Sequence, residues 1–150
     1  MARYGKIVYI NGPVVKAEGM DDFLMREMVM VGEKKLIGEV ISLERGTGTI
    51  QVYEETSGLR TGEMVTGTGK PLSVKLGPGI ITNIFDGIQR PLSKIYQAGG
   101  GFIPEGIGLI TLDEDKLWDV EILAKEGEYL KSGDVFAQVQ ETSLVLHKVM

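Results

Sequence analysis

A glycine-rich stretch that ends in lysine, Gly67-Thr68-Gly69-Lys70, is the first place in this sequence where chemistry could occur. Glycines followed by a lysine can wrap a phosphate group with backbone N–H groups. A P-loop also needs a glycine five residues before its Gly-Lys pair and a serine or threonine after the lysine. Met64 and Pro71 hold those positions here, and Gly99 to Gly101 fail the same test. We therefore interpret Gly67 to Lys70 as a glycine turn between two strands.

A second candidate is Lys148. The turn G-x-x-x-x-x-G-D at residues 127–134, followed by an apolar strand, resembles one half of a barrel-sandwich hybrid, the fold of biotinyl and lipoyl carrier domains. Biotin carriers place methionine on both sides of the modified lysine at a hairpin tip, whereas Lys148 is flanked by His147 and Val149. We interpret Lys148 as an ordinary lysine at a strand end. A stand-alone carrier or small-molecule binding module is the alternative function.

Acidic side chains gather in two runs, Glu54-Glu55 and Asp113-Glu114-Asp115. Both runs have the polar surroundings of solvated loops, and nothing places them in a pocket. The sequence has no cysteine and a single histidine, His147, which argues against thiol and histidine metal sites. No Ser/His/Asp pattern is visible either. We predict no catalytic, cofactor-binding or metal-binding residue within these 150 residues.

The composition is that of a soluble globular protein, with 43% hydrophobic and 25% charged residues. A net charge of -5 argues against sequence-independent nucleic-acid binding, which needs excess Lys and Arg to replace phosphate counterions. An oligonucleotide-binding barrel would also need a basic stripe beside stacking aromatics such as Tyr9 and Tyr53. No apolar run reaches the ~20 residues that cross a bilayer, and the N-terminus lacks signal-peptide features. We expect a cytoplasmic protein without membrane insertion.

Short β-type segments separated by glycine turns fill roughly the first half of the chain. Strands are predicted at residues 6–10, 14–17, 28–31, 35–43, 49–53, 63–68 and 72–76. The charged residues before the third strand (Asp21, Asp22, Arg26 and Glu27) are expected to be solvated. A small closed β-barrel over residues 1–76 is the economical arrangement, because closure removes unpaired sheet edges.

A connector is predicted at residues 77–98. Gly77-Pro78-Gly79 interrupts the strand pattern, and apolar residues 80, 81, 84, 85 and 88 then recur at helical spacing. The pattern predicts a short helix capped by Thr82 or Asn83, then a helical turn or two over residues 91–97. Gly99 to Gly101 are typical of a linker, and strands return at residues 118–123 and 135–140. The fold class is therefore all-β, with a second β region over residues 99–150.

Four stretches follow one another along the chain: GKIVYINGPVVKA, LIGEVISLERGTGTIQVYEETSGL, GPGIITNIFDGIQRPL and VQETSLVLHKVM. Together they resemble the start of the catalytic A subunit of archaeal-type and vacuolar-type rotary ATPases. The resemblance implies that residues 1–76 form the N-terminal barrel that holds alternating A and B subunits in a ring. It implies that residues 77–98 enter the nucleotide-binding domain, and that residues 99–150 begin the insertion, or bulge, that contacts the peripheral stalk.

The resemblance also implies what these residues lack. In the family, the P-loop, the glutamate that activates water and the adenine-pocket aromatics lie beyond Met150, so ATP and Mg²⁺ are expected to bind the parent subunit elsewhere. We expect an N-terminal fragment of a subunit that hydrolyses or synthesises ATP coupled to H⁺ or Na⁺ movement, peripheral to the membrane. The half barrel-sandwich would leave apolar groups uncovered (Val120, Ile122, Val135, Val139, Leu144 and Leu146), which favours self-association or partial disorder of the tail.

Overall fold

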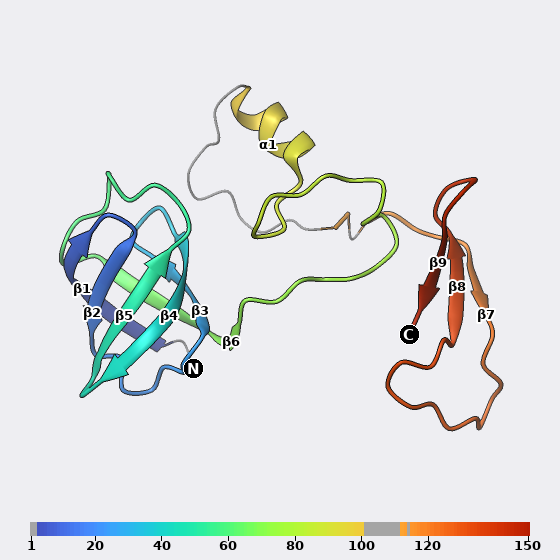
Figure 1. Cartoon of the computed structure of the whole chain (residues 1–150), viewed down its shortest axis with the longest axis horizontal. Coiled ribbons are helices and arrows are strands. Elements are labelled where there is room, and N and C mark those ends of the chain that lie inside the picture. Colours follow the sequence, from blue (N-terminus) through green and yellow to red (C-terminus); the bar gives the residue numbers. More distant parts are fainter. Residues whose placement is uncertain (1–2, 101–111, 114) are drawn as a thin grey trace. The chain divides into compact units, whose positions relative to one another are not determined.

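The computed structural model describes residues 3–100, 112–113 and 115–150 (Figure 1). These residues divide into two compact units. Residues 3–73 and 98–100 belong to the first unit, and residues 74–97, 112–113 and 115–150 form the second. Each unit buries apolar side chains of its own.

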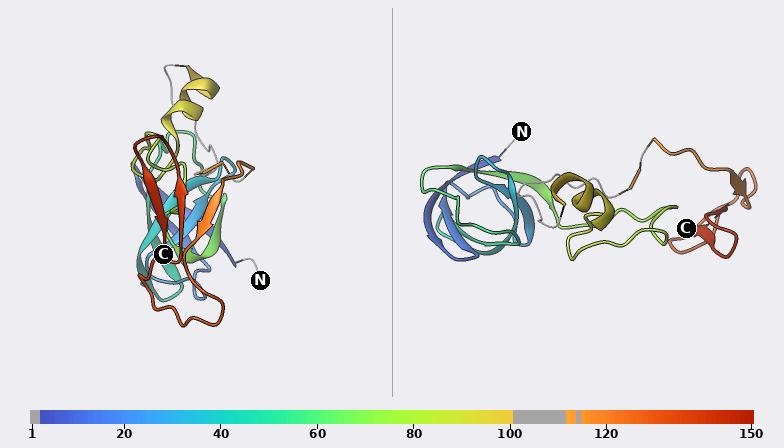
Figure 2. Two further views of the ribbon diagram at one scale, coloured as in Figure 1. Left: turned by 90° about the vertical axis from the view of Figure 1, so that its right-hand side faces the viewer. Right: turned by 90° about the horizontal axis from the view of Figure 1, so that it is seen from above.

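The first unit is a closed antiparallel barrel, seen nearly end-on in the right-hand view of Figure 2. Its six strands follow the order β1-β2-β5-β4-β3-β6, and β6 returns to pair with β1. The all-β class and the closed barrel are thus confirmed. The strands are β1 (Arg3–Asn11), β2 (Val14–Glu18), β3 (Glu27–Val31), β4 (Leu36–Glu44), β5 (Thr47–Val52) and β6 (Met64–Pro71).

The interior of the barrel is built by side-chain alternation. In β5, Ile50 and Val52 are buried whereas Gln51 is exposed, because successive side chains of a strand point to opposite faces. Each buried aliphatic side chain stabilises the fold by about 1.5–3 kcal/mol. The core consists of Ile7, Val15, Ala17, Met20, Phe23, Val29, Val31, Leu36, Val40, Ile50, Val52 and Val65.

Residues 72–76, predicted as a strand, form none. Their alternating pattern is suited to a strand, but β6 already pairs with both β1 and β3. The closed barrel therefore offers no free edge, and Leu76 is exposed. A strand needs a partner for its backbone N–H and C=O groups as well as the right side chains.

The predicted helix over residues 80–88 is also wrong, because the chain forms successive turns there. Ile81 and Ile84 are exposed and only Ile88 of the expected apolar face is buried, so too little packing is available to stabilise a helix there. The turn at residues 86–90 is held by Asp86, whose Oδ1 accepts the N–H groups of Ile88 and Arg90 at 3.1 and 2.8 Å. Asp86 Oδ2 lies 2.7 Å from Arg90 Nε, completing an ion pair.

A helix does form next, at α1 (Leu92–Gly99), close to the expected residues 91–97. Pro91 precedes its first residue, a place where proline's fixed φ suits the start of a helix. Ile95 is buried and gives the helix its packed face. Of the predicted glycine linker, Gly99 ends α1, and Gly101 lies outside the described residues.

The second unit contains a three-stranded antiparallel sheet in the order β7-β8-β9. Its strands are β7 (Val120–Ile122), β8 (Ala137–Gln140) and β9 (Leu146–Val149). Val139 is buried, contrary to the expectation that it would be left uncovered, and Val135 is half-buried. The remaining apolar side chains named for the tail are exposed as expected: Val120, Ile122, Leu144 and Leu146.

Candidate functional site

The glycine-rich stretch Gly67 to Lys70 lies within β6 and is not a turn between strands. Gly67 is paired with Arg3 of β1 on one side and with Val29 of β3 on the other. Its backbone therefore belongs to the ladders of the barrel, not to an anion-binding loop. A side chain is excluded at Gly67, because a Cβ atom would lie 2.6 Å from Glu27 Oε1.

Glu27 is a buried charge beside this strand, although its charged neighbours in sequence predict a solvated position. Its Oε1 accepts the N–H of Gly69 at 2.7 Å, and its Oε2 accepts the N–H of Leu24 at 2.8 Å. Arg3 Nη1 lies 3.3 Å from Oε2 and also donates to the carbonyl of Asp22. Each carboxylate oxygen is thus met by a donor, which is what a buried carboxylate requires.

The buried position of Glu27 could have been predicted from the sequence. In β3 the period of two places residues 27, 29 and 31 on one face, so Glu27 shares the inward face of Val29 and Val31. By contrast, Asp21, Asp22 and Arg26 precede the strand and are exposed, as predicted.

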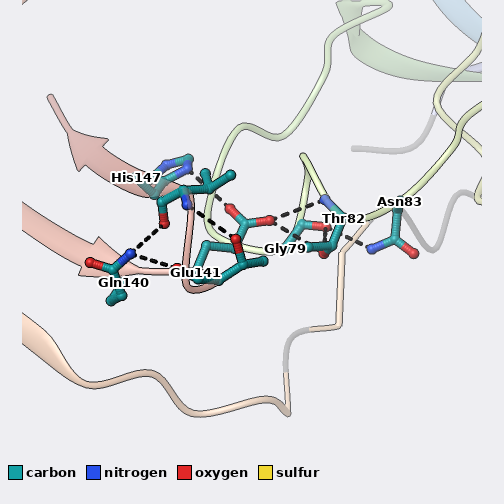
Figure 3. A network of polar contacts seen from close by, with 8 residues as sticks. Gly79, Thr82, Asn83, Gln140, Glu141 and His147 are labelled. Carbon is teal, nitrogen blue, oxygen red and sulfur yellow. Dashed lines mark hydrogen bonds and ion pairs between the residues drawn. The ribbon is translucent and has the colours of Figure 1, made fainter.

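In the second unit another buried carboxylate, Glu141, joins the connector to the three-stranded sheet (Figure 3). None of its side-chain surface is accessible to solvent. Its Oε1 accepts the backbone N–H of Thr82 at 3.2 Å, and the hydroxyl of Thr82 lies 3.3 Å from the same oxygen. Its Oε2 lies 3.5 Å from Nδ1 of His147 in β9. One carboxylate therefore contacts two segments that are far apart in the sequence.

The turn that carries Thr82 is itself held by side chains. Asn83 Nδ2 donates to the carbonyl of Gly79 at 2.6 Å, and the Thr82 hydroxyl lies 3.3 Å from that carbonyl. On the sheet side, Gln140 Nε2 donates to the carbonyl of Val145 at 3.2 Å. Thr82 and Asn83, predicted as helix caps, thus stabilise a turn by the same side-chain-to-backbone bonding that makes these residues good caps.

These contacts lower the pKa of Glu141 below its ordinary value. Burial alone would raise the pKa, but it is outweighed by N–H groups of Gly79 and Thr82, the Thr82 hydroxyl and the charge of His147. Glu141 is consequently an anion at neutral pH. We name the contacts of Glu141 with Gly79, Thr82 and His147 the Glu141 clasp.

The other candidate residues serve local structure where the chain is described. Glu54 Oε1 accepts the N–H of Ile37 at 3.0 Å, and Glu55 Oε1 accepts the N–H of Ser57 at 3.1 Å. Asp113 Oδ1 accepts the N–H of Asp115 at 3.2 Å, and Glu114 lies outside the described residues. Lys148 lies inside β9 opposite Gln138, not at a hairpin tip where a carrier lysine would be presented.

The two carboxylate centres therefore hold segments of chain together. Both Glu27 and Glu141 accept hydrogen bonds from backbone N–H groups, which fix the position of each carboxylate. Over residues 3–100, 112–113 and 115–150, no three His, Asp or Glu side chains gather in a way that would hold a metal ion. Within the same residues, no helix is long and apolar enough to cross a bilayer.

The outer surface of the barrel carries exposed side chains of the kinds that occur at protein–protein interfaces. Large apolar side chains are exposed on it, including Tyr4, Tyr9, Tyr53 and Met64. Exposed aromatic and methionine side chains are enriched at protein–protein interfaces. The barrel thus offers surface for contact with another protein.

Two family models match this chain. The model described as ATP synthase alpha/beta family, beta-barrel domain, matches residues 7–69. The model described as ATPsynthase alpha/beta subunit barrel-sandwich domain matches residues 109–150. The first match falls on the strands of the closed barrel, and the second contains the three-stranded sheet.

Curated relatives match nearly the whole chain. The V-type ATP synthase alpha chain 2 of Clostridium tetani is 66% identical over 146 residues, which is 97% of this chain and 25% of that protein. The V-type ATP synthase alpha chain of Halothermothrix orenii is 55% identical over 150 residues, again 25% of that protein. The A subunit of the A-type ATP synthase of Methanosphaera stadtmanae is 49% identical over 146 residues, 97% of this chain and 25% of that protein. The chain thus spans about a quarter of the length of these relatives.

Proposed function

Since the chain belongs to the ATP synthase alpha/beta family, as an N-terminal portion of the alpha chain, we propose that it serves assembly of a V/A-type rotary ATPase. In this role the barrel packs beside the barrels of B subunits in a ring, and the second unit contacts the peripheral stalk. The observation that carries the proposal is the closed barrel, whose strands coincide with the barrel domain of the family.

The exposed side chains of the barrel support a ring contact. Tyr4 and Tyr9 of β1, with Tyr53 after β5, are 56%, 48% and 40% exposed although the barrel core is complete without them. Burying such rings against a neighbour would stabilise the ring of subunits, because aromatic side chains contribute large contact areas at interfaces.

The parent subunit, in this proposal, hydrolyses or synthesises ATP coupled to ion movement, at the membrane surface and on its cytoplasmic side. ATP and Mg²⁺ are bound by parts of the parent other than these residues. The pairing of Gly67 with β1 and β3 supports a nucleotide site outside these residues, because the N–H groups of a phosphate-binding loop must be free to face the phosphate.

The test of assembly is a chimera. The chain replaces the corresponding quarter of the Clostridium tetani alpha chain, and the chimera is expressed with the other ring subunits of that organism. We expect rings of normal mass, and loss of rings when Tyr4 and Tyr9 are both changed to Ser. Lys16→Ser, an exposed β2 change opposite Tyr9, is the matched control and should leave ring formation intact. Rings that form equally well in all three proteins would contradict the proposal.

The test of nucleotide binding is titration calorimetry of the chain with Mg-ATP. We expect no binding. Binding in the micromolar range would contradict the proposal that the nucleotide site lies elsewhere, and loss of that binding in Lys70→Ala would assign it to the end of β6.

A further inference from the structure

We propose that Glu141 and His147 form a pH-sensitive latch that holds the turn at residues 79–83 to the β8–β9 hairpin. The latch is tight when the imidazole is protonated and looser when it is neutral. This inference does not depend on the assembly role, because it concerns contacts within the second unit alone.

The first step is the uneven environment of the two Glu141 oxygens. Oε1 is occupied by the Thr82 N–H at 3.2 Å. Oε2 is equally buried, yet it has no hydrogen-bond partner among the described residues. The group that faces it is Nδ1 of His147, at 3.5 Å. A buried acceptor without a donor is costly, so the state of this one ring decides how well Oε2 is satisfied.

The second step is the chemistry of imidazole. Protonated imidazole carries hydrogen on both ring nitrogens, so Nδ1 always presents a charged donor to Oε2. Neutral imidazole presents one only as the Nδ1-protonated tautomer, and the bond is then no longer charge-assisted at the donor. Histidine is the side chain that ordinarily changes charge between pH 5 and 8.

The third step is that few other charges reach this ring. In the sheet, His147 lies opposite Val139, which lies opposite Val120, so its flanking positions are apolar. The charged residues Glu121 and Lys148 both lie opposite Gln138 in the sheet, so their side chains are on the other face from His147. Residues 79–83 carry no charge.

Thr82 and Asn83 also line a small cavity, whose charged lining residues are Lys94, Asp113 and Lys116. Lys116 lies over the ring of Trp118, 3.9 Å from its centre. Among the described residues, none of these three forms an ion pair with Glu141 or His147. A change in the charge of His147 therefore acts mainly on Glu141, and through Glu141 on the N–H groups of Gly79 and Thr82 that the carboxylate accepts.

The charge of His147 therefore changes how firmly the turn at residues 79–83 is held to the β8–β9 hairpin. With His147 protonated, both oxygens of Glu141 are held and the turn is tied to the hairpin. When the ring loses its proton, Oε2 is left with a weaker donor and Glu141 is freer to release Thr82. The turn and the hairpin would then open from one another more often.

The experiment is an NMR titration of the whole chain between pH 5.5 and 8.0. His147 is the single histidine, so its ring signals report one titration without assignment ambiguity. We expect the Thr82 amide shift to follow the same midpoint as the ring. We also expect the hydrogen-exchange protection of the Thr82 amide, corrected for intrinsic pH dependence, to be about fivefold greater at pH 5.5 than at pH 8.0. This is the order of effect expected when one hydrogen bond, here that of His147 to Glu141, loses its charged donor. Separate midpoints, or protection unchanged with pH, would overturn the latch.

Two variants separate the latch from general effects of pH. His147→Gln should abolish the pH dependence of Thr82 protection. Lys148→Gln, on the opposite face of the same strand, should retain it. A His147→Gln protein that keeps the wild-type dependence, or a Lys148→Gln protein that loses it, would overturn the assignment to His147. Should His147→Gln fail to fold, the comparison of midpoints in the unaltered chain still decides.

Discussion

Two buried carboxylates, Glu27 and Glu141, each join segments of the chain through polar contacts. Each combines backbone N–H donors with a basic side chain, Arg3 for Glu27 and His147 for Glu141. In both cases donors come from segments remote in sequence. A single side chain can therefore fix how two segments of chain meet.

The first prediction concerns Glu27. Glu27→Gln should lower the free energy of unfolding of the barrel by about 2–3 kcal/mol, because Arg3 loses its buried counter-charge and one N–H loses its acceptor. Urea denaturation, followed through the NMR signal of Val29, measures the change. Glu18→Gln, at the exposed end of β2, is the control and should shift stability by no more than about 0.5 kcal/mol. Equal effects of the two changes would contradict the buried role.

The second prediction concerns Tyr53. Its hydroxyl donates to Glu39, and this bond, with burial and the charge of Glu39, raises the pKa of Tyr53 to about 12. Because the folded pKa is raised, the contribution to stability is complete below pH 10, the ordinary value, and is lost as the pH rises toward 12. Absorbance titration should show one of the five tyrosines ionising late. Glu39→Gln should move that late step toward the others, whereas Glu44→Gln should not.

Among the elements, β6 shows how one strand combines two functions. It closes the barrel by pairing with β1 and β3, and it leaves room for the Glu27 carboxylate by having glycine at position 67. A Cβ atom on Gly67 would also lie 2.9 Å from the ring of Phe23. The glycine at position 67 is therefore explained by close packing and needs no ligand.

The third prediction follows from this packing. Gly67→Ala should destabilise the barrel by about 1–3 kcal/mol, the usual cost of overpacking. Gly58→Ala is the control in the same unit, since its Cβ would meet the movable end of the Lys34 side chain. Urea midpoints of both variants test the difference. A Gly67→Ala barrel as stable as the Gly58→Ala barrel would show that β6 can shift to make room.

For the whole molecule, burial is distributed unequally. The extended cluster of buried apolar residues lies in the barrel, whereas the sheet of the second unit buries Ala137 and Val139 and leaves β7 exposed. Since apolar burial is the main favourable contribution to folding, the two units should differ in stability.

The fourth prediction is that the second unit unfolds first. In a urea titration followed by NMR, the signal of Val139 should be lost at lower urea than the signal of Val29. Val29→Ala, which removes buried atoms from the barrel, should lower the barrel midpoint. Coincident midpoints for Val139 and Val29 in the unaltered chain would show that the units unfold as one.

The fifth prediction is self-association through the sheet. Its exposed apolar side chains, among them Ile122 and Leu146, and its exposed strand β7 favour contact with a second copy. Light scattering should show mass above that of a monomer at high concentration, and Ile122→Lys should reduce it. A monomer at all concentrations, with strong amide protection across residues 118–146, would contradict this.

The sequence by itself was sufficient for features that depend on local periodicity. Strand alternation, as in Ile50 and Val52, and glycine turns were enough to predict the all-β class and the closed barrel, because burial repeats every second residue in a strand. The motifs were likewise sufficient to identify the family, which the barrel and barrel-sandwich matches confirm.

Only the tertiary structure decided which segments meet. Residues 72–76 have a strand pattern but no partner. Residues 80–88 have a helical pattern, but Ile81 and Ile84 are exposed rather than packed against other residues. Gly67 lies in a strand because β1 and β3 flank it. The Glu141 clasp joins Thr82 to a residue 59 positions away, a pairing that no local pattern encodes. Periodicity records which face a side chain occupies, whereas a buried charge is explained only by the donors that folding brings to it.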